Sequence, residues 1–274
     1  MNSLHHDLQE LKTLIDWRLE DDDENSFFRL QSAFRELVFE SAFLSDSINA
    51  QLDDILKRPL EASPHWMARN IVAIAEPNWQ LHYGIASHTS EFIRSNISHG
   101  LIAVIGPDPL IVDHYRTSKT IDTDVYDAGI SLLKPRREVY EPGSICVVDA
   151  RDGVASFIVD TPTTLVTLLG PPRRAIQWIF SRQTLRAVQS IPSNPADTEM
   201  AIMIRALTAM RCTTSIATLC ALTTHESHFV RWTALQALVE LSPEAAKSSL
   251  QRATKDVHPH VRMASAKAIA AMAA

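Results

Sequence analysis

Four histidines in the middle of the chain are the residues best suited to hold a metal ion. Three neutral imidazoles that converge can bind a transition metal and still leave positions open for a substrate. The separations in this sequence repeat no standard ligand spacing, so ordinary hydrogen-bonded histidines are the competing interpretation. If a metal site is built here, its expected ligands are His82, His88 and His114, and the nearby candidates are His99 and Glu91.

Other reactive residue types give weaker signals. The chain has three cysteines, Cys146, Cys212 and Cys220, with no CxxC pair, which favours a reduced, cytoplasmic compartment. Cys146 has no histidine or helix start evident beside it, so we interpret it as a small buried hydrophobe rather than a nucleophile. The basic pairs Arg136-Arg137 and Arg173-Arg174 are interpreted as solvated loop charges, although such pairs can also bind an anionic ligand or an acidic protein surface.

No complete catalytic motif is present in the sequence. It contains no phosphate-binding glycine loop, no GxSxG turn and no HExxH helix. The question of catalysis therefore stays open, and the residues favour a protein that is not an enzyme.

Composition sets broad limits on the class of protein. The chain has 274 residues, of which 46% are hydrophobic and 21% charged, so it can bury a core in one large domain or two modest ones. No apolar run approaches the roughly 18 residues that span a bilayer, and the first residues have no signal-peptide pattern. The net charge of −6 provides no basic field for nucleic acid. We expect a cytoplasmic protein with neither membrane nor nucleic-acid partners.

The position of the glycines predicts how the chain is organised. All seven lie between residues 84 and 170, and glycine concentrates where strands reverse direction. The predicted order is therefore helices, then sheet, then helices. Charge follows the same division, because residues 1–60 hold thirteen acidic and six basic side chains, whereas residues 196–274 hold six and eight.

The two flanks have helical periodicity. In residues 1–60, leucines and isoleucine recur every three or four positions (Leu4, Leu8, Leu11, Ile15 and Leu19), which predicts a first helix. An acidic run at 20–24 is interpreted as a solvated junction before a second helix near Asn25, and a third short helix is expected at Ile48–Leu56.

Residues 65–188 have the pattern of a β domain. Short apolar runs separated by turn signals predict a β-sandwich or double-stranded β-roll. Turns are expected at 106–109, 141–143 and 170–172, where glycine and proline occur together. The expected strands are Ile71–Ala75, Trp79–Ile85, Leu101–Ile105, Leu110–Tyr115, Ile130–Leu133, Ser144–Asp149, Ser156–Val159, Thr164–Leu169 and Ile176–Phe180.

Parts of this β domain resemble the cupin superfamily. The stretch Tyr140–Gly170 is similar to the second half of a cupin, in which a Pro-Gly turn opens a strand. Thr164–Pro172 and Ser98–Gly106 resemble strands of the cysteine-dioxygenase-like branch. The resemblance covers about residues 65–185 and implies a β-roll around a metal site.

The same resemblance places the family's three iron-binding histidines at residues that cannot bind iron. The His-x-His pair falls on Ile93 and Ser95, and the third histidine falls on Ala155. A shifted alignment offers His88, but the residue two positions earlier is Ala86. We therefore expect no cofactor, with these three residues lining a pocket that has lost its metal; the alternative is a rebuilt site for iron or another transition metal.

Residues 197–274 contain an internal repeat. His228–Leu238 aligns with Pro259–Ile269 at a constant offset of 31 residues. Asp256–Arg262 resembles the turn and helix start of HEAT repeats, which implies burial of Val230 and Val261 and packing roles for Arg231 and Arg262. In such a role the arginine bonds either turn carbonyls or a carboxylate of a neighbouring repeat. Such repeats imply a protein partner, and a homodimer through them is left open.

Two functions follow for this α+β multi-domain chain, and a purely structural pair of domains with a collapsed pocket filled by side chains is a third interpretation. The first is an adaptor, ligand sensor or accessory subunit, with a non-catalytic cupin-like domain, open to a small-molecule ligand, joined to a HEAT-like interaction module. The alternative is a non-haem metal-dependent dioxygenase acting on a small thiol or amino-acid-like substrate.

Overall fold

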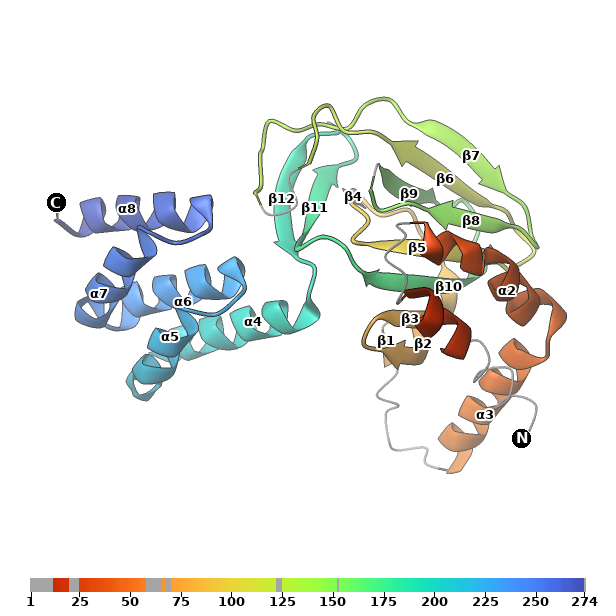
Figure 1. The fold of residues 1–274 in the computed structure, drawn as a ribbon, viewed down its shortest axis with the longest axis horizontal. Coiled ribbons are helices and arrows are strands. Elements are labelled where there is room, and N and C mark those ends of the chain that lie inside the picture. The colour runs from red at the N-terminus through yellow and green to blue at the C-terminus, as the bar shows by residue number, and fades with distance from the viewer. Residues whose placement is uncertain are drawn as a thin grey trace. The chain divides into compact units, whose positions relative to one another are not determined.

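The computed structural model describes residues 12–19, 25–57, 66–67, 70–121, 125–151 and 153–273. The chain divides into two compact units, with most residues up to 188 in the first and most residues from 189 onward in the second. Helices come first, strands follow and helices return, as Figure 1 shows. This order confirms the α+β class that the glycine distribution predicts.

The N-terminal helices belong to the first unit. Residues 12–19 are helical, and they are followed by the 3-10 turn η1 (Ser26–Leu30), α2 (Gln31–Arg35), the π-helical turn η2 (Glu36–Glu40) and α3 (Phe43–Lys57). The second helical segment begins beside Asn25 as expected, whereas α3 begins at Phe43 rather than near Ile48. The predicted helix positions Leu4, Leu8 and Leu11 and the acidic run at 20–24 lie outside the described residues.

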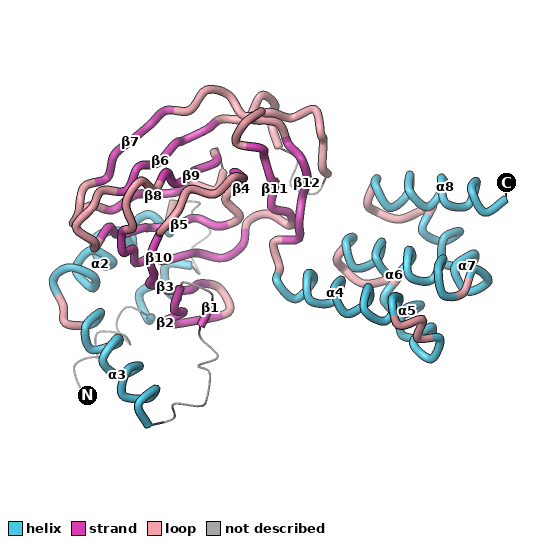
Figure 2. The backbone as a smooth tube through the Cα atoms, turned by 180° about the vertical axis from the view of Figure 1, so that it is seen from behind, coloured by secondary structure: helices cyan, strands magenta, loops and turns pink. Residues whose placement is uncertain are grey.

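The strands form one six-stranded and two three-stranded sheets. The large sheet has the order β1 (Trp66–Met67), β2 (Asn70–Glu76), β3 (Trp79–Ala86), β10 (Thr163–Pro172), β5 (Ser98–Val104), β8 (Ile145–Val148). The small sheets are β7 (Arg136–Tyr140), β6 (Leu110–Tyr115), β9 (Val154–Ile158), and β12 (Ala187–Pro192), β11 (Ile176–Ser181), β4 (Phe92–Arg94). The small sheets adjoin through β4 and β9 (Figure 2).

The large sheet is covered on both faces. Along β5, Leu101 and Ala103 pack in a cluster with side chains of the N-terminal helices, such as Phe27 and Phe34. The alternate residue Ile102 packs on the other face, in a cluster that includes side chains of β6. Because successive strand residues point to opposite faces, all seven residues of β5 are buried. The apolar run that predicted this strand reflects burial on both sides.

One predicted strand and one predicted loop need correction. The strand expected at Ile130–Leu133 does not form, and that segment contributes only isolated bridges of Ser131 and Leu132. The pair Arg136-Arg137 does not lie in a loop, because both residues belong to β7. Arg137 binds Asp113 through two hydrogen bonds of 2.8 and 2.9 Å. Strands β1, β4 and β12 were also not expected from the sequence.

The glycine-proline signals mark different features. Gly143 has a φ of +82°, in the left-handed region, and therefore makes the predicted turn before β8. The turn predicted at 170–172 is absent, because β10 continues to Pro172 with irregular pairing after Leu169. A Cβ atom on Gly170 would lie 3.0 Å from the ring of Phe27, so this glycine serves a close approach between strand and helix.

The C-terminal helices pack around their own core. They are α4 (Pro195–Ala209), the 3-10 turn η3 (Thr213–Ser215), α5 (Ile216–Leu222), α6 (His228–Leu241), α7 (Pro243–Ala253) and α8 (Pro259–Ala273). Val230 and Val261 are the third residues of α6 and α8 and are 0% and 1% exposed, which confirms their predicted equivalence. No described helix has the length and apolar character needed to cross a membrane.

The contacts of the two arginines repeat at the same 31-residue offset. Arg231 Nη1 donates to the carbonyls of His225 and Glu226 at 2.8 and 2.7 Å. Arg262 Nη1 donates to the carbonyls of Asp256 and Val257 at 2.7 and 2.9 Å. Each arginine therefore donates hydrogen bonds to carbonyls of the turn before its own helix, which is the packing role expected for it.

Candidate functional site

A group of polar side chains lies between the large sheet and the β7-β6-β9 sheet. Leu110 and Val112 of β6 face this interior, where they pack with residues of the large sheet. His114 is two positions further along β6 and therefore faces the same side. Glu138 is the register partner of Val112, and Tyr140 is the partner of Leu110, so β7 adds two polar side chains to the interior.

Glu138 is the centre of this group. Its Oε2 atom accepts a hydrogen bond of 2.6 Å from the Tyr140 hydroxyl and lies 3.2 Å from His114 Nε2. Its Oε1 atom lies 2.9 Å from Arg136 Nη2. Tyr140 also packs with Cys146 of β8 in one cluster, so the group reaches the large sheet. One carboxylate thus accepts a hydrogen bond from Tyr140 of β7 and lies close to His114 of β6, with its own side chain 32% exposed.

The surroundings fix the charge of each member. The Tyr140 hydrogen bond holds the pKa of Glu138 below its usual range, and burial raises the pKa of Tyr140. Burial lowers the pKa of His114 and outweighs the opposite effect of Glu138. Burial raises the pKa of Cys146 to about 12. Near neutral pH the group therefore holds one carboxylate anion, a neutral imidazole and a protonated thiol, which suits hydrogen bonding rather than nucleophilic attack.

The three histidines proposed as alternative metal ligands have different neighbours. His82 lies on β3, where Nε2 contacts Gln80 Oε1 at 2.9 Å, and burial lowers its pKa. His88 lies in the loop after β3 and is exposed, with Nδ1 3.5 Å from Ser87 Oγ. His114 is held beside Glu138. Within the described part of the chain, no group of three or more His, Cys, Asp or Glu side chains could hold a metal ion.

The residues that the resemblance predicts at the ligand positions lie on or beside neighbouring strands. Ile93 is on β4 and Ser95 follows it; they are 0% and 1% exposed. Ala155 is half-buried on β9, opposite His114 in the register. The hydrocarbon side chains of Ile93 and Ala155 offer no atom that can ligate a metal, so these residues do not fit the iron that the family implies. Their assignment as former ligand positions stays a prediction.

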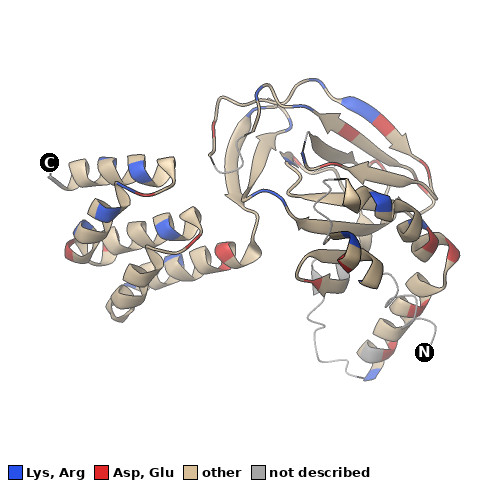
Figure 3. Ribbon diagram, in the orientation of Figure 1, with Lys and Arg blue, Asp and Glu red and all other residues tan. Residues whose placement is uncertain are grey.

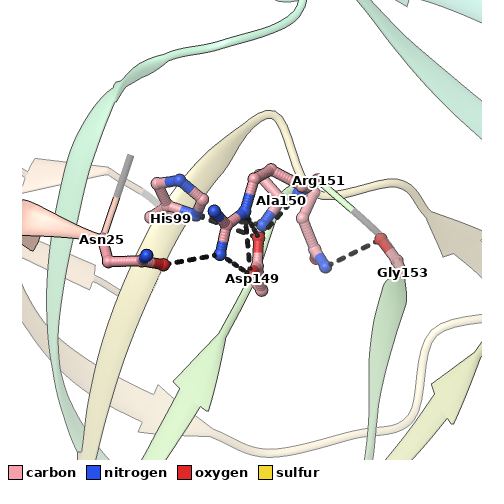
Figure 4. A network of polar contacts seen from close by, with 7 residues as sticks. Asn25, His99, Asp149, Ala150, Arg151 and Gly153 are labelled. Atoms are coloured by element: carbon pink, nitrogen blue, oxygen red, sulfur yellow. Dashed lines mark hydrogen bonds and ion pairs between the residues drawn. The ribbon is translucent and has the colours of Figure 1, made fainter. Parts of the chain in front are cut away.

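A second polar network fixes the loop that precedes Ala155 (Figure 4). Arg151 binds the carboxylate of Asp149 and reaches Asn25 Oδ1 at 3.1 Å. The buried ring of His99 accepts a hydrogen bond of 3.1 Å from the Ala150 N–H at Nδ1 and packs against Phe28 with ring centroids 4.7 Å apart.

This second network has a structural role. Although burial opposes it, the hydrogen bonds from Arg151 hold the pKa of Asp149 below its usual range. The network ties the β8–β9 loop to the N-terminal helical segment, and His99 takes part in it through Nδ1 and its ring face.

Sequence reasoning missed Glu138 and Tyr140. They are spaced by two residues on one strand, which would have placed both on the same face. The preceding basic pair concealed the strand, because two adjacent arginines are typical of a loop. A strand prediction that included Arg136 would have brought Glu138 beside the predicted candidate His114.

Comparison with protein families identifies the C-terminal part of the chain. Residues 189–272 match the family model of HEAT repeats, in agreement with the internal repeat and its contacts. The match begins before the predicted boundary at 197, and α4 itself begins at Pro195. No curated protein matches the chain.

Solved structures that resemble the chain are cupin and double-stranded β-helix proteins. A hydroquinone 1,2-dioxygenase from Sphingomonas sp. TTNP3 with 4-hydroxybenzoate bound has 13% identity and a TM-score of 0.31, and the match covers 42% of this chain and 70% of that one. A cupin-2 domain protein from Shewanella frigidimarina has 10% identity and a TM-score of 0.27, covering 46% and 92%. At these TM-scores and identities the similarities carry no conclusion about the class or the activity of this chain.

Proposed function

We propose that this protein is a non-catalytic adaptor, in which the HEAT-like helices bind a partner protein and the cupin-like domain serves as a scaffold. The proposal is supported by the residues that the cupin resemblance predicts at the metal-ligand positions. Ile93 and Ala155 cannot coordinate iron, and Ile93 is fully buried.

The interior of the roll supports the same function. Ile102, Val104 and Leu165 of the large sheet pack against Leu110 and Val112 of β6, so apolar side chains fill this part of the space between the sheets. In the second unit, stacked helices present extended surfaces of the kind that repeat proteins use for binding. A scaffold joined to a binding module is the simplest function for such a combination.

One observation favours a second candidate, a metal-dependent dioxygenase-like enzyme. His114 of β6 and Glu138 of β7 lie 3.2 Å apart with both side chains only partly buried, and both are residue types that ligate transition metals. Metal analysis of the purified full-length protein tests this alternative. Near-stoichiometric metal that is lost in His114→Ala would support the enzyme and contradict the adaptor.

The adaptor itself is tested by cross-linking the full-length protein in its native cells and mapping the cross-linked peptides. We expect partner cross-links on residues 195–273 that disappear in Val261→Asp, which places a charge in the helical core. Val257→Asp is the matched control, because Val257 is 88% exposed. Partner cross-links confined to the β domain, and unchanged in Val261→Asp, would contradict the proposal.

A further inference from the structure

Arg231 and Arg262 hold their own turns alike but differ in their second set of contacts. Arg231 also donates from Nε and Nη2 to the two carboxylate oxygens of Asp256, at 2.8 and 2.6 Å. Asp256 belongs to the turn before α8, so α6 receives a carboxylate from the unit that stacks on it. Among the contacts of the described residues, none occupies Nε or Nη2 of Arg262, and this side chain is exposed.

The surroundings of α6 and α8 differ along one face. Trp232 and Leu235 of α6 are partly and fully buried, and both pack in the helical core. The residues 31 positions later are Met263, which is 63% exposed, and Ala266, which is also exposed. In contrast, Ala234 and its equivalent Ser265 are both 0% exposed, so the opposite face is covered in both helices. Met263 and Ala266 of α8 are therefore exposed at the positions where their α6 counterparts are partly or fully buried.

The charge of α8 indicates what this face would accept. The helix carries Arg262 and Lys267 and no acidic residue, as the blue and tan segments of Figure 3 show. An arginine fork binds a carboxylate through two parallel hydrogen bonds, which is the geometry of the Arg231–Asp256 pair. A basic, partly apolar helix face therefore suits an amphipathic segment with an acidic residue at its start.

We propose that Arg262, Met263, Ala266 and Ala270 form a docking face for a helical segment of the partner protein. The segment presents an Asp or Glu side chain to Arg262, as Asp256 is presented to Arg231, and lays an apolar stripe over Met263 and the two alanines. This assignment rests on the proposed adaptor function and names the chemistry of the partner.

The probe is a synthetic peptide with residues 254–273 of this chain, which carries Asp256 and the sequence of the helix that packs on α6. We expect the peptide to bind the full-length protein and to slow hydrogen exchange in α8. Arg262 of the protein is the expected partner of Asp256 in the peptide. The variant Arg262→Gln of the protein should therefore weaken peptide binding about tenfold or more. Arg205→Gln is the matched control, an exposed arginine on α4, and should leave binding unchanged.

A second variant separates binding from loss of the turn contacts of Arg262. Met263→Glu changes an exposed side chain and should weaken peptide binding while the helical circular dichroism stays the same. The peptide with Asp256→Asn should bind the wild-type protein more weakly than the original peptide does. This loss of affinity should be no larger than the loss seen when the original peptide binds the Arg262→Gln protein.

Three outcomes would overturn the assignment: no binding above that of a scrambled peptide, binding unaffected by Arg262→Gln and Met263→Glu, or protection outside α8. Self-association of the full-length chain that is lost in Met263→Glu would instead assign the face to a second copy. The proposed function is judged separately. If partner cross-links vanish in Val261→Asp but persist in Met263→Glu, the adaptor stands and this docking face is wrong.

Discussion

Arg231 and Asp256 form an ion pair in which both side chains are less than a tenth exposed, at 8% and 9%. Two charged hydrogen bonds and two turn carbonyls satisfy the guanidinium, so removing either partner leaves a buried charge without compensation. This pair connects a helix with the turn of the following unit.

We expect Arg231→Gln to lower the free energy of unfolding of the helical module by about 3–5 kcal/mol, because Asp256 would remain buried and unpaired. Chemical denaturation followed by helical circular dichroism measures the change. Arg205→Gln, at an exposed position, should change the stability by less than about 0.5 kcal/mol. Equal denaturation midpoints for the two variants would show that the pair is not important for stability.

A histidine pair next to this ion pair predicts sensitivity to acid. The rings of His228 and His258 stack with centroids 3.7 Å apart, and His260 and Arg231 lie nearby. The pKa of His228 is lowered to about 4, mainly by burial and then by repulsion from His258, Arg231 and His260. The carboxylate of Asp256 raises this pKa, but its effect is the smallest.

Since the folded pKa of His228 is below the ordinary value of 6.5, the unfolded chain binds more protons in this range. The contribution of neutral His228 to the free energy of unfolding is therefore complete above about pH 6.5 and is lost as the pH falls towards about 4. Denaturation of the module at several pH values should show this decline, and His228→Gln should reduce it. A decline of the same size in His228→Gln would assign the effect to other groups.

At this scale the sequence predicted roles best where a pattern repeated. The 31-residue repeat gave Val230 and Val261, and the HEAT resemblance implied that the arginines bond turn carbonyls or a carboxylate of a neighbouring repeat. It did not identify Asp256, which lies 25 residues after Arg231 in the turn before α8, as that carboxylate. Glu138 was missed because its function depends on strand register, which places it beside His114 only after the sheet has formed.

The strands of the large sheet and those of the small sheets differ in how well their own sequence predicts them. The strands of the large sheet are apolar on one or both faces, so β3, β5 and β10 were predicted close to their observed bounds. Strand β4 has three residues and β7 begins with two arginines, and neither presents a period-two apolar pattern. Pairing with their neighbours, rather than local propensity, makes them strands.

Helix α8 provides a direct test of the repeat packing. Val261→Asp would bury an unpaired carboxylate at a site that is 1% exposed, at a cost of several kcal/mol. We expect the helical circular dichroism to fall and proteolytic cleavage to appear after about residue 195. Val257→Asp makes the same chemical change at a position 88% exposed and should resist protease like the wild type. A protease-resistant Val261→Asp would contradict the stacked repeat.

On the scale of the whole molecule, each unit has its own hydrophobic core. The N-terminal helices share a core cluster with the large sheet, so the sequence segments at 1–60 and 65–188 pack together, whereas the helices of 197–274 have a cluster of their own. The glycine distribution predicted the order of helices and strands, but it contained no information about which helices would cover the sheet.

Because the cores are separate, we expect two transitions when the full-length protein is heated in a calorimeter. Val261→Asp should remove or lower the transition of the helical unit and leave the transition of the β unit at its original temperature, since Val261 packs only in the helical core. A single transition that shifts as a whole in Val261→Asp would mean that the two units unfold together.

The contact between Phe27 and Gly170 has a consequence for how the chain is made. A ribosome adds roughly 5–20 residues per second, so Phe27 emerges many seconds before the strand against which it packs. Throughout that interval the apolar side of the first helices, including Leu30 and Phe34, has no sheet to cover it. Nascent chains stalled before Gly170 should therefore bind chaperones that recognise exposed hydrophobic segments, and release from the chaperone should wait until β10 has left the exit tunnel.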